Sequence, residues 1–291
     1  MIRYEVSHRT TIEYRQPVSL SQQLLRLTPR TTPQQRVEFS QIDLEPESVG
    51  RIDHDDVFGN RCTYLTIRES HRRLSLRARS LVDVSPARTL ADVVPWEHAV
   101  DLASRPNGRT AAQVSLFAYR SPYVDSPPEA GELTCDVFLP GRPLLEAVRV
   151  LTERIHREFR YQGGLTDVWT PVAEVLRHRR GVCQDFAHLQ IACLRQLGLP
   201  CRYVSGYLLT HPPAGQAKLV GADESHAWVS VWSPQVGWVD FDPTNAVLPG
   251  EEHVTIGWGR DYGDVSPVNG FIVGGGEHTV RVAVDVIQIP A

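Results

Sequence analysis

Cys183 stands where a nucleophilic thiol is expected. It follows the turn residue Gly181 and opens a helical pattern that stops at Gly198. The reactive form of a cysteine is the thiolate, which a positive local potential favours. A helix N-terminus supplies that potential through its unpaired N–H groups and its dipole, and the same groups can bind the oxyanion of an acyl-transfer intermediate. The position therefore predicts that Cys183 is a nucleophile.

A thiolate nucleophile needs an imidazole as its base, and two histidines come into question. His188 lies five residues after Cys183, and about 500° of helical rotation turns it away from the sulfur. His226 opens the strand pattern S-H-A-W-V-S-V-W. One face of this strand is apolar, which leaves His226 on the other face beside Trp228; the apolar residues are Ala227, Val229 and Val231. We therefore expect His226 to be the base.

A carboxylate normally holds such a base in its tautomer and orientation. The strand G-W-V-D-F-D-P-T-N offers Asp240 and Asp242 on one face, and spacing alone leaves both open. Asp185 lies in the first turn of the cysteine helix. If this carboxylate faced the sulfur, its negative charge would disfavour the thiolate. We therefore expect Asp185 to cap helix N–H groups instead.

The elements that must position these residues fall into three regions. Residues 1–84 alternate apolar and polar positions between turn signals, which predicts a compact antiparallel sheet, with strands in 2–6, 11–14, 37–44, 62–67 and 74–84. Residues 85–134 are proline-rich and predict a connecting region with one or two short helices. Residues 135–291 are predicted to form the catalytic core with C-terminal strands.

Within the core, apolar residues at spacings of three and four predict a helix over 144–159. Thr170 and Pro171 open a short helix that Arg177 to Arg180 close, and the cysteine helix follows. Strands are expected over 201–209, 226–232 and 237–242, then a loop containing G-W-G-R-D-Y-G-D and a last strand over 279–289. The predicted class is α+β, with the cysteine helix packed on an antiparallel sheet.

Composition narrows the function classes. Thirty basic against 34 acidic residues give a net charge of −4, which argues against a nucleic-acid binder. The five cysteines have no C-x-x-C spacing, so neither a disulfide scaffold nor a zinc site is expected; Cys62, Cys135, Cys193 and Cys201 are predicted to be inert core thiols. The charged N-terminus and the absence of long apolar runs predict a cytoplasmic protein without a membrane partner.

Three motifs resemble the transglutaminase-like superfamily of papain-related cysteine enzymes: G-V-C-Q-D-F-A-H, S-H-A-W and F-D-P-T-N. The resemblance implies that Cys183 is the nucleophile, His226 its base and Asp242 the orienting carboxylate. R-Y-E-V-S-H-R-T-T-I-E-Y, L-R-L-T-P-R and D-V-F-G-N resemble the β-rich N-terminal domain of bacterial transglutaminase-like proteins, and residues 259–262 resemble their C-terminal region. The resemblance thus covers nearly the whole chain.

One position departs from the animal transglutaminases, which usually carry tryptophan after the nucleophile where this chain has Gln184. The departure argues against crosslinking activity in particular. Candidates for the side-chain part of the oxyanion hole are Gln184, Tyr161 and Trp169. Arg260, Asp261 and Tyr262 are candidates for the cleft wall, with a simple turn as the alternative.

The expected activity is acyl transfer from an amide through a thioester, without a metal or organic cofactor. We expect hydrolysis of a peptide or small amide. Transamidation of protein glutamine is the alternative. A third interpretation is a binding or assembly module whose N-terminal domain recruits a protein partner while the thiol is idle.

Overall fold

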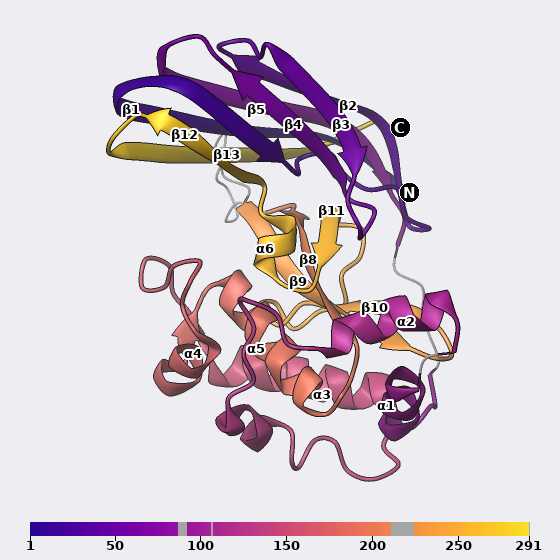
Figure 1. Ribbon diagram of the computed structural model, residues 1–291. Helices are drawn as coiled ribbons and strands as arrows, with labels where there is room; N and C mark the ends of the chain where they lie inside the picture. The colour runs from indigo at the N-terminus through magenta and orange to yellow at the C-terminus, as the bar shows by residue number, and fades with distance from the viewer. Residues whose placement is uncertain (87–91, 106, 211–223, 291) are drawn as a thin grey trace, which may run out of the picture.

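The N-terminal layer is an antiparallel sheet built around one long strand (Figure 1). The computed structural model describes residues 1–86, 92–105, 107–210 and 224–290. The strands follow the order β2-β5-β1-β4-β3, with β1 (Ile2–Leu25), β2 (Gln35–Glu45), β3 (Gly50–Asp55), β4 (Arg61–Ile67) and β5 (His71–Val84). The antiparallel sheet expected over residues 1–84 is therefore present.

The strand β1 is longer than the sequence pattern indicated. Residues 2–6 and 11–14 were expected as separate strands, whereas β1 is one strand of 24 residues. Pro17 falls where the pairing with β5 shifts register, between Glu13 and Val18, and a proline is tolerated at such an irregularity because no ladder hydrogen bond is needed there. The sequence pattern missed β3 because all of its residues are exposed, which leaves no alternation to read.

Two C-terminal strands complete this sheet. β13 (His278–Ile289) pairs with residues 3–14 of β1, and β12 (Val268–Gly274) pairs with residues 18–25. The sequence interpretation grouped these strands with the catalytic core, but their pairing places them in the N-terminal sheet. The physical reason is the free edge of β1, whose backbone N–H and C=O groups need partners.

The connecting region contains short helices, as expected. They are α1 (Trp96–Ser104) and α2 (Arg109–Ser115), followed by the 3₁₀ helices Leu116–Ala118 and Pro128–Leu133. Among the described residues, no helix has the length and apolar character that crossing a bilayer requires.

The core combines helices with a second antiparallel sheet of order β10-β9-β8-β11. Its helices are α3 (Leu144–Glu158), α4 (Val172–His178), α5 (Cys183–Gln196) and α6 (Tyr262–Val265), and its strands are β8 (Cys201–Leu208), β9 (Glu224–Ser233), β10 (Gly237–Phe241) and β11 (His253–Gly259). The short strands β6 (Arg160–Tyr161) and β7 (Arg180–Gly181) pair in parallel. The loop expected at G-W-G-R-D-Y-G-D, residues 257–264, is wrong in part, because residues 257–259 end β11 and residues 262–264 belong to α6.

Side chains from the N-terminal layer bind the edge of β11. The Gln35 side chain donates from Nε2 to the Thr255 carbonyl (2.7 Å) and accepts from the Thr255 N–H (2.8 Å). Asn60 bonds to Trp258 in the same way, with both distances 2.9 Å. Each side-chain amide thus donates and accepts one backbone hydrogen bond, as a neighbouring strand would. These bonds hold the second sheet against the first.

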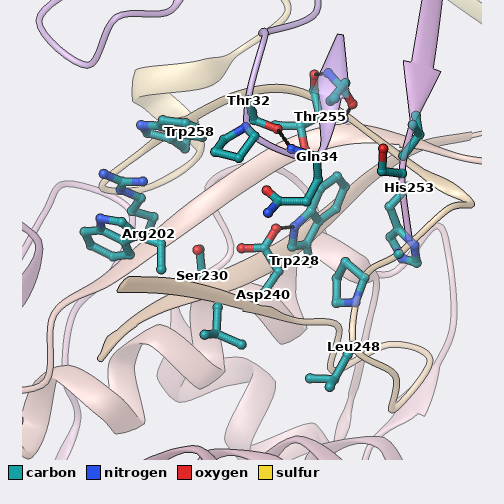
Figure 2. Close-up of a pocket in the computed structure, with 18 of the residues that line it drawn as sticks. Thr32, Gln34, Arg202, Trp228, Ser230, Asp240, Leu248, His253, Thr255 and Trp258 are labelled. Carbon is teal, nitrogen blue, oxygen red and sulfur yellow. Dashed lines mark hydrogen bonds between the residues drawn. The ribbon is translucent and has the colours of Figure 1, made fainter. Parts of the chain in front are cut away.

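An apolar cluster and a cavity lie between the two sheets. The cluster draws buried residues from both layers: Tyr4, Val6, Val82, Val84, Tyr207, Val254, Ile256, Val284 and Val286. Beside it is a cavity of about 390 Å³ lined by Gln34 of the N-terminal layer and by Arg202, Trp228 and Asp240 of the core sheet (Figure 2). The interface between the two sheets is therefore apolar at the cluster and partly polar at the cavity.

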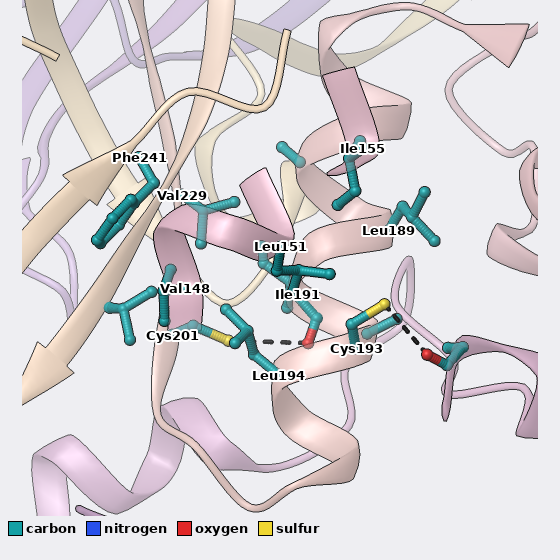
Figure 3. Packing of buried hydrophobic residues seen from close by; sticks show 14 of the residues in the cluster. Val148, Leu151, Ile155, Leu189, Ile191, Cys193, Leu194, Cys201, Val229 and Phe241 are labelled. Carbon is teal, nitrogen blue, oxygen red and sulfur yellow. Dashed lines mark hydrogen bonds between the residues drawn. The ribbon is translucent and has the colours of Figure 1, made fainter. Parts of the chain in front are cut away.

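The helix α5 is almost completely buried against β8 and β9 (Figure 3). Leu189, Ile191 and Leu194 pack in one cluster with residues of α3 and of the sheet. Cys193 and Cys201 lie in the same cluster, and burial raises the pKa of their thiols to about 12 and about 11. The packing holds the helix rigidly, so its first residue has a defined position.

Candidate active site

Cys183 is the first residue of α5, as the sequence predicted, and its thiol is partly accessible. Two residues later, Asp185 Oδ2 accepts hydrogen bonds from the Val182 N–H (2.8 Å) and from Thr166 Oγ1 (2.7 Å). The expectation that Asp185 caps the helix is therefore confirmed. A Cβ atom at Gly181 would lie 2.6 Å from the same carboxylate oxygen, so only glycine leaves room for this cap.

His226 lies in β9 beside the start of α5. Its Nε2 is 2.8 Å from Asp242 Oδ2, and the Cys183 side chain is close enough to influence its pKa. Since Asp242 occupies Nε2, the ring nitrogen left for the thiol is Nδ1. Burial lowers the pKa of His226, but the hydrogen bonds and charges of Asp242 and Cys183 outweigh it and raise the pKa to about 10. The imidazole is therefore held as an imidazolium at neutral pH.

Asp242 is fully buried and bonded on both oxygens. Besides His226, its Oδ2 accepts from Asn245 Nδ2 (2.7 Å) and lies 3.3 Å from His253 Nε2. Its Oδ1 accepts the backbone N–H groups of Thr244 (2.8 Å) and Asn245 (3.2 Å). Burial raises the pKa of Asp242, but the hydrogen bonds from the two histidines outweigh it and hold the pKa well below its usual range. The group is thus a fixed carboxylate.

The other two candidates of the sequence lie elsewhere. Asp240 Oδ2 accepts from Trp228 Nε1 (3.0 Å), so the structure brings Asp242 to the imidazole and leaves Asp240 with the indole. His188 is buried on α5, where its Nε2 accepts the Tyr262 N–H (3.2 Å) and burial lowers its pKa to about 3. The expectation that His188 faces away from the thiol is confirmed.

His253 is the residue that sequence reasoning missed. It opens β11, is buried, and its ring packs edge-on against Trp228 at a centroid distance of 5.3 Å. The alternation of Val254, Ile256 and Trp258 was the available signal for a strand. Gly250, Gly257 and Gly259 lie in or next to this segment and obscured the strand pattern.

The three candidates for a side-chain oxyanion donor have other partners or are exposed. Gln184 Nε2 donates to the Val168 carbonyl (3.3 Å). Trp169 is 72% exposed and stacks on Tyr123 at 4.8 Å, and Tyr161 is 47% exposed at β6. Of the three, Gln184 is the one next to Cys183 in the sequence, and its side-chain hydrogen bond ties it to the loop before α4.

The segment 260–262 is mainly structural. Asp261 is buried and accepts the N–H groups of Gly263 (2.9 Å) and Tyr123 (3.0 Å), which caps α6. Arg260 pairs with Asp264. The Tyr262 ring meets Tyr123 edge-on at 5.9 Å, so Trp169, Tyr123 and Tyr262 form one aromatic row. Only Tyr262 of the three proposed cleft residues belongs to this row.

The cysteines divide into two groups, and all five are free. Cys62, Cys193 and Cys201 are buried, in agreement with the sequence expectation. Cys135 is exposed, so the prediction of a core position for it is wrong; it follows the last 3₁₀ turn at the surface. A thiol reagent therefore meets Cys183 and Cys135 first.

A metal ion would compete with the bonds just described. His226, Asp242 and His253 form a buried group whose ligand atoms all lie within 4.8 Å of one another. However, the two imidazole Nε2 atoms already face the same oxygen of Asp242. A metal bound there would take both nitrogens and break the hydrogen bond that orients His226.

Comparison with known proteins identifies the family of the chain. Residues 4–83 match the bacterial transglutaminase-like N-terminal region, and residues 135–243 match the transglutaminase-like superfamily. The chain belongs to this superfamily. An uncharacterized protein of Mycobacterium tuberculosis is 40% identical over 299 residues, 98% of this chain and 92% of that protein. Another, from Mycobacterium leprae, is 30% identical and covers 99% and 100% of the two chains.

Two further proteins resemble the chain in part or in fold. A protein-glutamine gamma-glutamyltransferase of Pseudomonas aeruginosa is 42% identical over 72 residues, 24% of this chain and 11% of that protein. A crystal structure of a candidate cysteine protease from Cytophaga hutchinsonii has a TM-score of 0.77 and 21% identity, covering 100% of this chain and 91% of that one. The second likeness establishes the fold.

The raised pKa of His226 can be measured directly. In a titration of the His226 ring protons by NMR, we expect the folded protein to keep an imidazolium until about pH 10. The urea-unfolded chain should titrate near 6.5. Because the folded pKa is higher, this group stabilises the fold fully below about pH 6.5, and the contribution is lost as the pH rises to about 10. Asp242→Asn should lower the folded midpoint; an unchanged midpoint would contradict the assigned cause.

Replacing His253 with phenylalanine tests its bond to Asp242. The ring shape is retained and the donor is lost, so we expect a loss of about 1.5–3 kcal/mol in the free energy of unfolding, the usual worth of a hydrogen bond to a charged group. His253→Gln, which restores a donor, should recover part of this stability. Urea denaturation of the three proteins measures the difference, and equal stability of the phenylalanine variant and the wild type would show that the bond is unimportant.

Proposed function

We propose that the protein catalyses acyl transfer from an amide through a thioester on Cys183, with water as the acceptor. The observation that carries the proposal is the chain of contacts from the Cys183 thiol through His226 to Asp242. A thiol at a helix N-terminus, beside an imidazole held by a carboxylate, is the arrangement of an activated cysteine nucleophile. The proposed substrate is a peptide or a small amide.

The proposed steps follow from the placement of the three side chains. Cys183 Sγ attacks the amide carbonyl carbon, and the N–H groups of the first turn of α5 stabilise the oxyanion. The imidazolium of His226 gives its Nδ1 proton to the leaving amine, and the C–N bond breaks to leave a thioester. His226 then takes a proton from water, whose oxygen attacks the thioester. The carboxylic acid leaves and Cys183 is free again.

Asp242 contributes orientation and charge. It holds His226 by Nε2, so that Nδ1 stays directed at the sulfur, and its negative charge stabilises the imidazolium that donates the proton. The remaining bonds of Asp242, to Asn245 and to two backbone N–H groups, prevent it from turning away. The buried carboxylate thus keeps the imidazole of His226 in one orientation.

Transamidation is the second candidate, because the short region shared with the Pseudomonas aeruginosa protein-glutamine gamma-glutamyltransferase is 42% identical. A glutamine peptide incubated with a labelled primary amine distinguishes the two reactions. Hydrolysis releases ammonia and yields a glutamate peptide without label. Incorporation of the amine in proportion to the ammonia released would overturn the assignment of water as acceptor.

A thiol probe tests whether Cys183 is activated at all. Iodoacetamide at neutral pH should alkylate Cys183 in the Cys135→Ala variant faster than it alkylates Cys135 in the Cys183→Ala variant. Cys135 is exposed and Cys183 only partly accessible, so accessibility alone would favour Cys135, and faster reaction of Cys183 would reflect activation of its thiol. If Cys183 reacts no faster, the enzyme proposal fails in favour of a binding module. The cytoplasmic location stays a prediction.

A further inference from the structure

The cavity between the two sheets lies directly behind the candidate site. Two of its lining residues, Trp228 and Asp240, each stand two positions from a member of the site, His226 and Asp242 respectively. Its volume of about 390 Å³ is within the range of small-molecule sites. Figure 2 shows Arg202, Ser230 and Asp240 on the strands and Gln34 opposite them. The cavity is thus bounded by both layers of the protein.

Arg202, Ser230 and Asp240 form a row across three strands. Arg202 of β8 pairs in register with Ser230 of β9, which pairs with Asp240 of β10. Cross-strand partners point to the same side of a sheet, so a cation and a carboxylate face one cavity with a hydroxyl between them. The row is the polar wall of the cavity.

The Arg202 guanidinium is caged by aromatic rings and lacks an anionic partner. It lies 3.5 Å from the Trp238 ring centroid, 4.5 Å from Trp258 and 5.0 Å from Phe117. Its Nε is buried without a hydrogen-bond partner, and no carboxylate of the described residues forms an ion pair with it. Burial lowers its pKa to about 9. The rings fix the cation in place, and its charge interacts with that of Asp240 without forming an ion pair.

Asp240 carries the opposite charge on the same wall. It accepts from Trp228 Nε1 at 3.0 Å, and burial raises its pKa although Ser230, Trp228 and Arg202 act in the opposite direction. Trp238, which holds the guanidinium, is two residues before Asp240 on the same strand face, a separation of about 6.6 Å. The two charges are therefore near one another but unpaired, and each is penalised by burial.

We propose that this cavity binds a free α-amino acid with an apolar side chain, with the ligand carboxylate on Arg202 and its ammonium on Asp240. An anion alone would be repelled by Asp240 and a cation alone by Arg202, whereas a zwitterion neutralises both buried charges. The apolar lining from Pro33, Val236, Leu248 and Trp258 is suited to the ligand side chain. Because binding needs no reaction, the proposal is independent of the catalytic function.

Calorimetric titration of L-leucine into the Cys183→Ala protein tests the site without turnover. We expect saturable binding with one site per chain. Two matched probes each lack one charge: 4-methylpentanoate has no ammonium, and 3-methylbutylamine has no carboxylate. Each should bind at least tenfold more weakly than leucine. Equal affinity for either probe, or no binding of leucine, would overturn the proposal.

Variants locate the binding. Arg202→Gln and Asp240→Asn should each weaken leucine binding at least tenfold. In case these buried changes impair folding, Leu248→Trp blocks the cavity from an exposed position, and Val247→Trp is its matched control, since Val247 is also exposed but does not line the cavity. The first should weaken binding and the second should not. Binding that survives Leu248→Trp, or that disappears when Cys183 of the wild-type protein is alkylated, would place leucine elsewhere and contradict the proposal.

Discussion

Replacing Cys183 with alanine is expected to reduce the rate of amide hydrolysis by about 10⁴-fold or more, the usual consequence of removing a covalent nucleophile. The fold should be retained, because Cys183 is partly accessible at the end of a helix whose remaining residues are buried. The measurement is ammonia release from a glutamine peptide, with circular dichroism to verify folding.

The matched control for this variant is Cys135→Ala. Cys135 is the exposed thiol and lies outside the group formed by Cys183, His226 and Asp242, so its loss should leave the rate unchanged. A Cys183→Ala protein with more than one hundredth of the wild-type rate would mean that the amide is cleaved without a thioester.

Replacing His226 with glutamine is expected to lower the same rate by about 10²–10⁴-fold, the typical contribution of a general acid–base group. Both steps of the proposed reaction use this imidazole, first as the proton donor to the amine and then as the acceptor from water. The thiol of the variant should also be alkylated more slowly, because the neighbouring imidazolium is absent.

Two further proteins make the His226 experiment decisive. His278→Gln changes an exposed histidine of β13 and should leave the rate unchanged. The double variant of Cys183→Ala and His226→Gln should be no slower than Cys183→Ala alone, because residues that act as a unit are not additive. A double variant slowed by the product of both effects would show that the two side chains act separately.

Local patterns predicted much of the fold. The periodicity around α3 and α5 and the strands β8 to β10 were readable because a helix or strand records its buried face in the spacing of a few residues. The same reasoning missed β3, which has no buried residues, and β11, whose alternation is interrupted by glycine. Patterns of burial can be read only where a segment has two unlike faces.

The candidate site was predictable in part for the same reason. The start of α5 marks Cys183, and the strand S-H-A-W marks His226, since each signal lies within a few residues. Asp240 and Asp242 share a strand face, so spacing could not separate them. Their partners do: the indole of Trp228 binds Asp240, and His226 binds Asp242.

Local sequence patterns were enough to predict an N-terminal β layer, a cysteine at a helix start, and a histidine and an aspartate on successive strands. They could not show that β12 and β13 pair with β1, that His253 shares Asp242 with His226, or that Arg202 and Asp240 face one cavity without an ion pair. The physical reason is the separation in sequence between the residues that interact. Helix starts and alternation are encoded by neighbours in the chain, whereas these contacts depend on which strands pair, in which register, and on how the two sheets pack.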